Sequence, residues 1–158
     1  MTTLSYPSEA FPAPPEFTID VPSHWRNVET PDALVASIDP TGTVFQSNLT
    51  VAAERFVVTM SLHQIAAKVI SDRNERLTQH HAESPTAATN PAGPSVRWSS
   101  TLVVELDGEP LVLTQWTMLV DQPASTTLRF VTVATLTVLS TATDTVNAAQ
   151  IMDSLTMA

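Results

Sequence analysis

Four histidines are the side chains in this sequence best suited to acid–base catalysis near neutral pH. They are His24, His63, His80 and His81. A catalytic triad would also need a nucleophilic serine and an acid beside one of these rings, and no motif in the sequence places them there. A nucleophile elbow needs two glycines flanking its serine, and the three glycines of the chain are far apart. We therefore predict no catalytic residue, and we rank a histidine-dependent hydrolase or isomerase third among the functions considered.

A metal site is conceivable where His80, His81 and Glu83 follow one another, because imidazole and carboxylate groups bind divalent cations. Adjacent side chains seldom point the same way, and metal sites need rigid supports. These three residues are therefore expected to be solvated surface residues. Because the chain contains no cysteine, disulfides, thiolate zinc sites and iron–sulfur clusters are excluded. We expect no metal and no cofactor.

Large apolar side chains offer a different chemistry, the binding of a small apolar ligand. The candidate ligand-binding residues are Trp25, Trp98, Trp116 and Met118. Counting outward from a turn at Asp107-Gly108 pairs Trp98 with residues 115–117, which brings it near Trp116. Tryptophans also fill the cores of twisted sheets, and core packing is the favoured interpretation.

Charge and composition narrow the range of partners. The chain of 158 residues has 16 acidic and 7 basic residues and a formal net charge of −9, so it should repel nucleic acid and anionic membranes. Its 43% of hydrophobic residues predicts a folded domain. No apolar run approaches the ~18–20 residues of a membrane span, and the N-terminal residues do not resemble a signal peptide. We therefore expect a cytoplasmic protein without membrane insertion.

The first half of the chain predicts three strands and one helix. Residues 1–16 are rich in proline and should form an extended lead-in, and residues 17–158 should form a single domain. Strands are expected at residues 17–21, 34–38 and 44–53 from their alternating or β-rich patterns. Ser61 followed by Gln64 has the spacing of a capping box, and the apolar residues after it recur at helical intervals.

The second half predicts a loop, three strands and a closing helix. Residues 79–94 contain three prolines and should form a long irregular loop. Residues 95–106 and 109–120 flank Asp107-Gly108, which is a preferred two-residue hairpin turn. The run 126–139 is apolar on both faces, as expected of a central strand. Thr143 or Asp144 should cap the last helix.

The predicted order of elements is therefore β-β-β-α-β-β-β-α. This order lacks βαβ alternation, so the strands should form one antiparallel sheet covered by two main helices. The fold class predicted from the sequence is α+β.

Several of these segments together resemble the Mog1/PsbP-like fold, and more narrowly the LpqN-type proteins of actinobacteria. The resemblance is carried by Phe17-Thr18-Ile19-Asp20-Val21-Pro22, Trp25, Asn48-Leu49-Thr50-Val51, the capped helix, the Asp107-Gly108 hairpin, Gln115-Trp116, the strand at 126–139 and Ile151-Met152-Asp153-Ser154-Leu155. It spans residues 17–155 and implies a three-layer α/β/α sandwich used as a binding or adaptor module, with no shared catalytic residues. LpqN-type proteins are typically lipoproteins, whereas this sequence has no cysteine to carry a lipid.

These observations favour a non-enzymatic protein-binding or adaptor module, chaperone-like toward a secreted or envelope partner. The partner would be another protein, and a homodimer is an alternative arrangement. The second hypothesis is a small apolar-ligand-binding domain with a pocket lined by the tryptophans.

Overall fold

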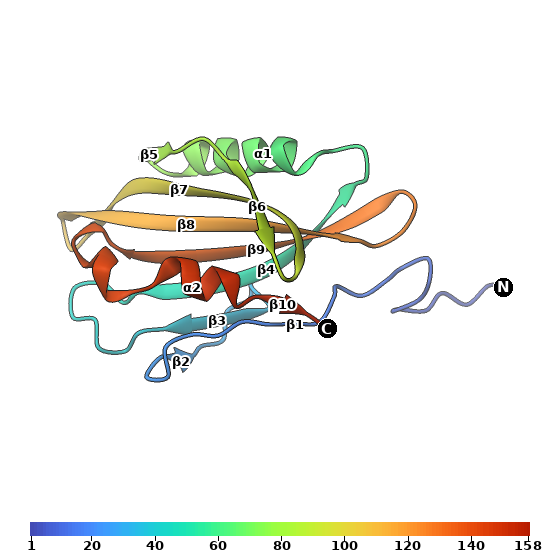
Figure 1. Cartoon of the computed structure of the whole chain (residues 1–158), viewed down its shortest axis with the longest axis horizontal. Helices are drawn as coiled ribbons and strands as arrows, with labels where there is room; N and C mark the ends of the chain where they lie inside the picture. The colour runs from blue at the N-terminus through green and yellow to red at the C-terminus, as the bar shows by residue number, and fades with distance from the viewer.

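An antiparallel sheet of eight strands forms the middle of the molecule (Figure 1). The structure is a computed structural model that describes residues 1–158, apart from the side chain of Pro123. Its elements are β1 (Phe17–Thr18), β2 (Arg26–Asn27), β3 (Val35–Ile38), β4 (Asn48–Val57), α1 (Leu62–Arg76), β5 (Gln79–Ala82), β6 (Thr86–Asn90), β7 (Gly93–Leu106), β8 (Glu109–Pro123), β9 (Leu128–Leu139), the 3₁₀ helix η1 (Ser140–Thr145), α2 (Ala148–Asp153) and β10 (Thr156–Met157). The strand order is β2-β3-β4-β9-β8-β7-β5, β6 also pairs with β7, and β1 pairs with β10 in a separate two-stranded sheet. The fold class is therefore α+β, as predicted.

Strand β9 lies at the centre of the sheet, between β4 and β8. Val131, Ala134, Leu136 and Val138 are all 0% exposed; Val131 lies on one face, and the other three share the opposite face. The prediction of a central strand with two apolar faces is confirmed.

The long hairpin of β7 and β8 turns at the two residues expected from the sequence. Asp107 and Gly108 both have positive φ angles, 53° and 80°, and Leu106 pairs directly with Glu109. Positive φ at both central residues matches the right-handed twist of the flanking strands. The turn therefore fixes which residues of β7 and β8 share a face.

The two helices cover opposite faces of the sheet. Helix α1 packs its Ile65 and Ala66 against Val96, Leu119 and Val131. The other face holds a larger core in which α2 joins the N-terminal segment. That core includes Trp25, Leu49, Val51, Met118, Ala134, Leu136, Ile151, Met152 and Leu155, with Phe17, Ile19 and Val21 packed against it. Three layers result, with the sheet in the middle.

Three parts of the chain differ from the sequence-based expectation. The strand expected at residues 17–21 is limited to Phe17–Thr18, and it pairs with β10 outside the main sheet. Residues 79–94 are not an irregular loop, because β5 and β6 both pair with the edge of β7. Pro85 lies between these strands and Pro91 in the turn after β6, so neither proline removes a ladder hydrogen bond. The last helix begins later than expected: η1 occupies residues 140–145, and Asn147 caps α2.

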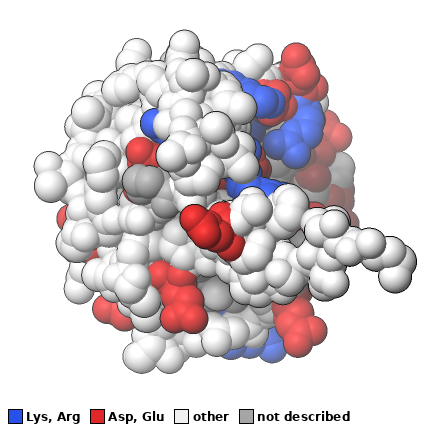
Figure 2. Space-filling model, turned by 90° about the vertical axis from the view of Figure 1, so that its right-hand side faces the viewer, with Lys and Arg blue, Asp and Glu red and all other residues white. Residues whose placement is uncertain are grey.

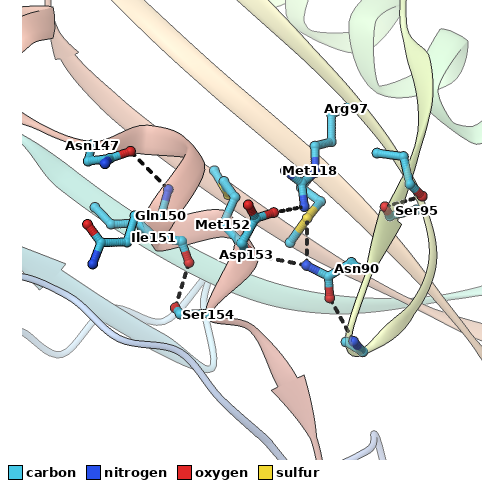
Figure 3. Close-up of polar contacts among 12 residues, drawn as sticks. Asn90, Ser95, Arg97, Met118, Asn147, Gln150, Ile151, Met152, Asp153 and Ser154 are labelled. Atoms are coloured by element: carbon cyan, nitrogen blue, oxygen red, sulfur yellow. Dashed lines mark hydrogen bonds and ion pairs between the residues drawn. The ribbon is translucent and has the colours of Figure 1, made fainter.

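Helix α2 is held to the sheet by a buried asparagine at the end of β6 (Figure 3). The Asn90 side chain donates to the carbonyl of Met152 at 3.0 Å and contacts the Met118 sulfur at 3.5 Å. It also accepts from the Ala92 N–H at 2.8 Å. Nearby, Arg97 and Asp153 form an ion pair at 2.6 Å. One short strand thus ties the C-terminal helix to the core.

The capping box predicts the effect of removing the Ser61 hydroxyl. Ser61 accepts from the Gln64 N–H at 3.1 Å, and the Gln64 side chain accepts from the Ser61 N–H at 2.8 Å. Ser61→Ala should lower the free energy of unfolding by about 1 kcal/mol in urea titration. Ser84→Ala, at an exposed position outside any helix, is the control. Equal effects of the two substitutions would contradict the capping role.

Asn90→Ala should destabilise the protein more strongly. It leaves the Met152 carbonyl and the Ala92 N–H without their side-chain partner in a region where Asn90 is only 4% exposed. We expect a loss of about 2–4 kcal/mol in the free energy of unfolding, since each unsatisfied buried group costs roughly 1–3 kcal/mol. Asn27→Ala, on exposed β2, should change it by less than about 0.5 kcal/mol. A loss at Asn90 no larger than at Asn27 would refute this role.

Candidate functional site

An apolar groove runs between the N-terminal segment and strands β3 and β4. Its volume is about 410 Å³, and we call it the edge groove. It is defined by Phe17, Ile19, Val21, Leu34, Val35 and Leu49. This volume falls within the roughly 300–1,000 Å³ typical of ligand pockets.

The edge groove extends the larger core outward to the surface. Leu49 and Ala36 are 2% and 7% exposed, whereas Leu34 and Val35 are 54% and 44% exposed. Val35 and Leu49 lie on the same face of the sheet, because Val35 pairs with Val51 and Leu49 with Ser37. The groove therefore has a buried apolar floor and an apolar rim in contact with solvent.

The four residues predicted to line one ligand pocket lie in different places. Trp25 and Met118 are 8% and 0% exposed in the core beneath α2, with Trp116 packed against that core. Trp98 pairs with Thr117 and belongs to the core under α1. Trp98 and Trp116 are thus near in register but point to opposite faces. The structure does not bring the four side chains into one cavity.

A smaller hollow between α2 and strands β6–β8 touches two of these residues. Trp98 and Trp116 line it together with Ala148, Ala149 and Met152, and its volume is about 240 Å³. This is below the usual range of ligand pockets. That these residues bind a ligand stays a prediction. The edge groove, which they do not line, is the larger cavity.

One histidine lies beside an acid, an arrangement that no sequence motif indicated. His24 Nε2 is 3.4 Å from Asp39 Oδ1, and the same oxygen accepts from the Thr41 hydroxyl at 2.6 Å and from the Thr41 N–H at 2.9 Å. The Thr41 bonds, and then His24, lower the pKa of Asp39. The hydroxyl bonds the acid rather than the imidazole, so the group stabilises the Asp39–Gly42 turn and does not form a triad.

The other histidines lie along α1 and β5. His63 is exposed in the first turn of α1, and His80 Nδ1 lies 2.6 Å from Asn74 Oδ1. His80 and His81 follow each other in β5 and therefore point to opposite faces. Among the described residues, no group of three or more His, Asp or Glu side chains is arranged to hold a metal ion.

A polar cluster lies under the C-terminal half of α1. The Arg73 guanidinium donates to Gln115 Oε1 at 2.9 Å, to Thr117 Oγ1 at 2.7 Å and to Thr135 Oγ1 at 3.1 Å. Its Cζ also lies 5.9 Å from the centre of the Trp98 ring, in cation–π geometry. We name this the Arg73 cluster, which comprises Arg73, Trp98, Ser100, Gln115, Thr117 and Thr135.

The electrostatics of this cluster are unusual for an acidic protein. Burial, with a smaller effect of Arg76, lowers the pKa of Arg73 to about 10, so the side chain remains charged at neutral pH. Burial, followed by the charges of Arg73 and His81, also lowers the pKa of His80. Arg73 donates its three hydrogen bonds to neutral oxygens. The cluster is therefore a partly buried positive charge held by hydroxyl and amide groups.

The sequence contains a signal for this cluster that was missed. Arg73 continues the apolar stripe of α1, four residues after Val69 and three after Ile70. Gln115 and Thr117 interrupt the apolar pattern of β8 at alternate positions. A charged residue on a buried helix stripe opposite polar strand positions indicates a buried polar contact.

Figure 2 shows acidic side chains spread over this face, with most of the visible Lys and Arg side chains toward its upper right. In the described part of the chain, no helix has the length and apolar character needed to cross a bilayer.

Comparisons with known proteins identify the fold. No family model and no curated protein sequence matches the chain. Among solved structures it is similar to LpqN, involved in cell envelope biogenesis of Mycobacterium tuberculosis, with a TM-score of 0.63, 19% identity and coverage of 92% of this chain and 85% of LpqN. It also resembles a protein of Bacteroides thetaiotaomicron VPI-5482, with a TM-score of 0.51 and 14% identity, covering 90% of this chain and 45% of that one. The chain therefore shares the fold of LpqN, and the LpqN-type resemblance seen in the sequence is confirmed at the level of the fold.

Proposed function

We propose that the chain is a non-enzymatic protein-binding module of the Mog1/PsbP-like type, whose partner inserts apolar side chains into the edge groove. The observation that carries this proposal is the exposure of Leu34 and Val35 at the rim of a groove whose floor is buried core. Scattered apolar residues are common on protein surfaces, but apolar residues gathered around a concavity are typical of interaction sites.

The geometry of the sheet edge favours docking by side chains over docking by strand addition. Edge strand β2 has only two residues, Arg26 and Asn27, and a short edge offers few free backbone groups to a new strand. The groove beside it has a buried apolar floor, so an apolar side chain inserted there would leave water. Burial of that surface would supply the binding energy, at about 25 cal/mol per Å² before the costs of association.

The positions of the histidines support a non-enzymatic role. Three histidines are at least partly exposed and lie outside the edge groove, and His24 serves a turn with Asp39. None of the groove-lining side chains is a nucleophile held against a base. A groove of this composition fits binding better than acid–base chemistry.

The class of partner is inferred from the fold neighbour. LpqN is involved in cell envelope biogenesis, and this chain shares its fold. A secreted or envelope protein with an exposed apolar segment is therefore the proposed partner, and the role is that of an adaptor or chaperone.

A small apolar ligand is the second candidate occupant, because the volume of the groove suits one. Native mass spectrometry of the purified protein distinguishes a bound small molecule from a protein partner. A retained small molecule that is lost from Leu34→Asp would favour the ligand over the protein partner.

The test uses a photo-crosslinking amino acid at position 34 in cells of the source organism. We expect one reproducible protein adduct at position 34, and Val35→Asp in the same chain should reduce its yield at least tenfold by placing a charge at the groove rim. The matched control carries the crosslinker at Val112, an apolar residue of similar exposure, 46%, on β8.

Adducts with the same proteins at positions 34 and 112, or no adduct at 34, would refute docking in the groove. An adduct with a second copy of this chain would replace the proposed partner by a homodimer. Thermal unfolding of the Asp variants should change little, because Leu34 and Val35 are already exposed.

A further inference from the structure

Arg73 is a partly buried cation that forms no ion pair with an acid among the described residues. The ion pairs among the described residues are His24–Asp39, Lys68–Asp72, Arg97–Asp153 and Arg129–Asp121. The nearest acid along the helix, Asp72, is 3.0 Å from Lys68 and is thus engaged elsewhere. Taking a charged guanidinium out of water without a counterion is costly.

The groups around Arg73 supply more hydrogen-bond donors than acceptors. A guanidinium has five N–H donors, and the three bonds to Gln115, Thr117 and Thr135 leave two of them available. The indole N–H of Trp98 and the hydroxyl of Ser100 are buried and have no partner among the described residues. These two residues are 5% and 3% exposed. The N–H groups of Arg73 and Trp98 can only donate, and the Ser100 hydroxyl can donate as well, so an acceptor ligand would partner all of them.

The strand register brings these donors together. Trp98 pairs with Thr117, and Ser100 pairs with Gln115, so all four side chains lie on the α1 face of neighbouring strands. Arg73 bonds both of the β8 residues. Its guanidinium therefore lies above β7 and β8, on the face that holds the unpartnered groups of Trp98 and Ser100.

A ligand can reach this point from one side of the helix. Helix α1 contacts β5, β7 and β8, while Thr50 and Ala52 on β4 and Thr135 on β9 are only partly buried on the same face. Thr135 is itself bonded to Arg73. The guanidinium therefore lies at the border between the covered and the open parts of this face.

The geometry points to an oxyanion-binding site at the Arg73 cluster, which takes the carboxylate or phosphate group of a ligand approaching over β4 and β9. A guanidinium matches the paired oxygens of both groups. The anion would accept from the free N–H groups of Arg73 and from Trp98 and Ser100, and it would neutralise the partly buried charge. This site is on the opposite face of the sheet from the edge groove, so it is independent of the proposed function.

The test titrates the whole chain with sodium phosphate and, separately, with sodium acetate, against sodium chloride of equal ionic strength. Two signals are followed, the melting temperature and the ¹H–¹⁵N resonance of the Trp98 indole, which Trp98→Phe assigns. Binding should shift the indole resonance saturably and raise the melting temperature by about 3–6 °C at ten times Kd.

Matched variants separate this site from general salt effects. Arg73→Gln should weaken binding at least tenfold. If glutamine at this position disturbs the helix, Arg73→Lys is measured in its place. Arg76→Gln removes the same charge from an exposed position three residues away and should leave Kd within twofold. Ser100→Ala should weaken binding severalfold.

A saturable response to either oxyanion that is lost with Arg73 supports the site, and the probe that binds more tightly identifies its chemistry. The absence of a saturable indole shift, or a response equal to that of chloride or retained in Arg73→Gln, would overturn it.

Discussion

Strand β9 has apolar side chains on both faces, and both faces must be removed from water for the chain to fold. No single helix can do this, because a helix covers only one face of a sheet. The structure therefore depends on two covering layers of different origin. Helix α1 and its buried Ile65 and Ala66 cover one face, while the short α2 covers the other only with help from residues 17–21. This difference between the layers determines where open surface remains.

The edge groove arises in the layer formed by α2, which covers its face of the sheet less completely. Helix α2 has six residues, too few to span strands of up to 15 residues, and the N-terminal segment completes its layer with Phe17, Ile19 and Val21. Only Phe17 and Thr18 of that segment form a strand, and they pair with β10 rather than with the main sheet. A gap is left between this segment and β3, and the exposed rim residue Val35 lies there. The concavity thus arises from how the core is closed.

Local signals in the sequence predicted those features that depend on neighbouring residues. The capping box at Ser61, the Asp107-Gly108 turn and the two apolar faces of β9 are each encoded within a short stretch. Strands β5 and β6 were missed because they are short, their Ala and Asn residues have weak strand preference, and prolines lie between and after them. The edge of β7 supplies their pairing. The pairing of Trp98 with residues 115–117 was confirmed, because Trp98 pairs with Thr117. A range of three positions does not decide which face Trp116 shares, since a shift of one position in register moves a side chain to the other face.

On the face covered by α1, the open part of the sheet is polar, because the apolar stripe of the helix reaches the charged Arg73. Had position 73 been leucine, the polar groups of Gln115, Thr117 and Thr135 would lack their present donor, and those strand positions would favour apolar residues as well. The polar residues of the helix and of two strands are thus mutually dependent, although they are 42 to 62 positions apart in sequence. A purely structural role would need no charge here, because apolar side chains often replace buried charges without loss of stability. The charge of Arg73 and the unpartnered groups of Trp98 and Ser100 are the two features that packing alone does not require.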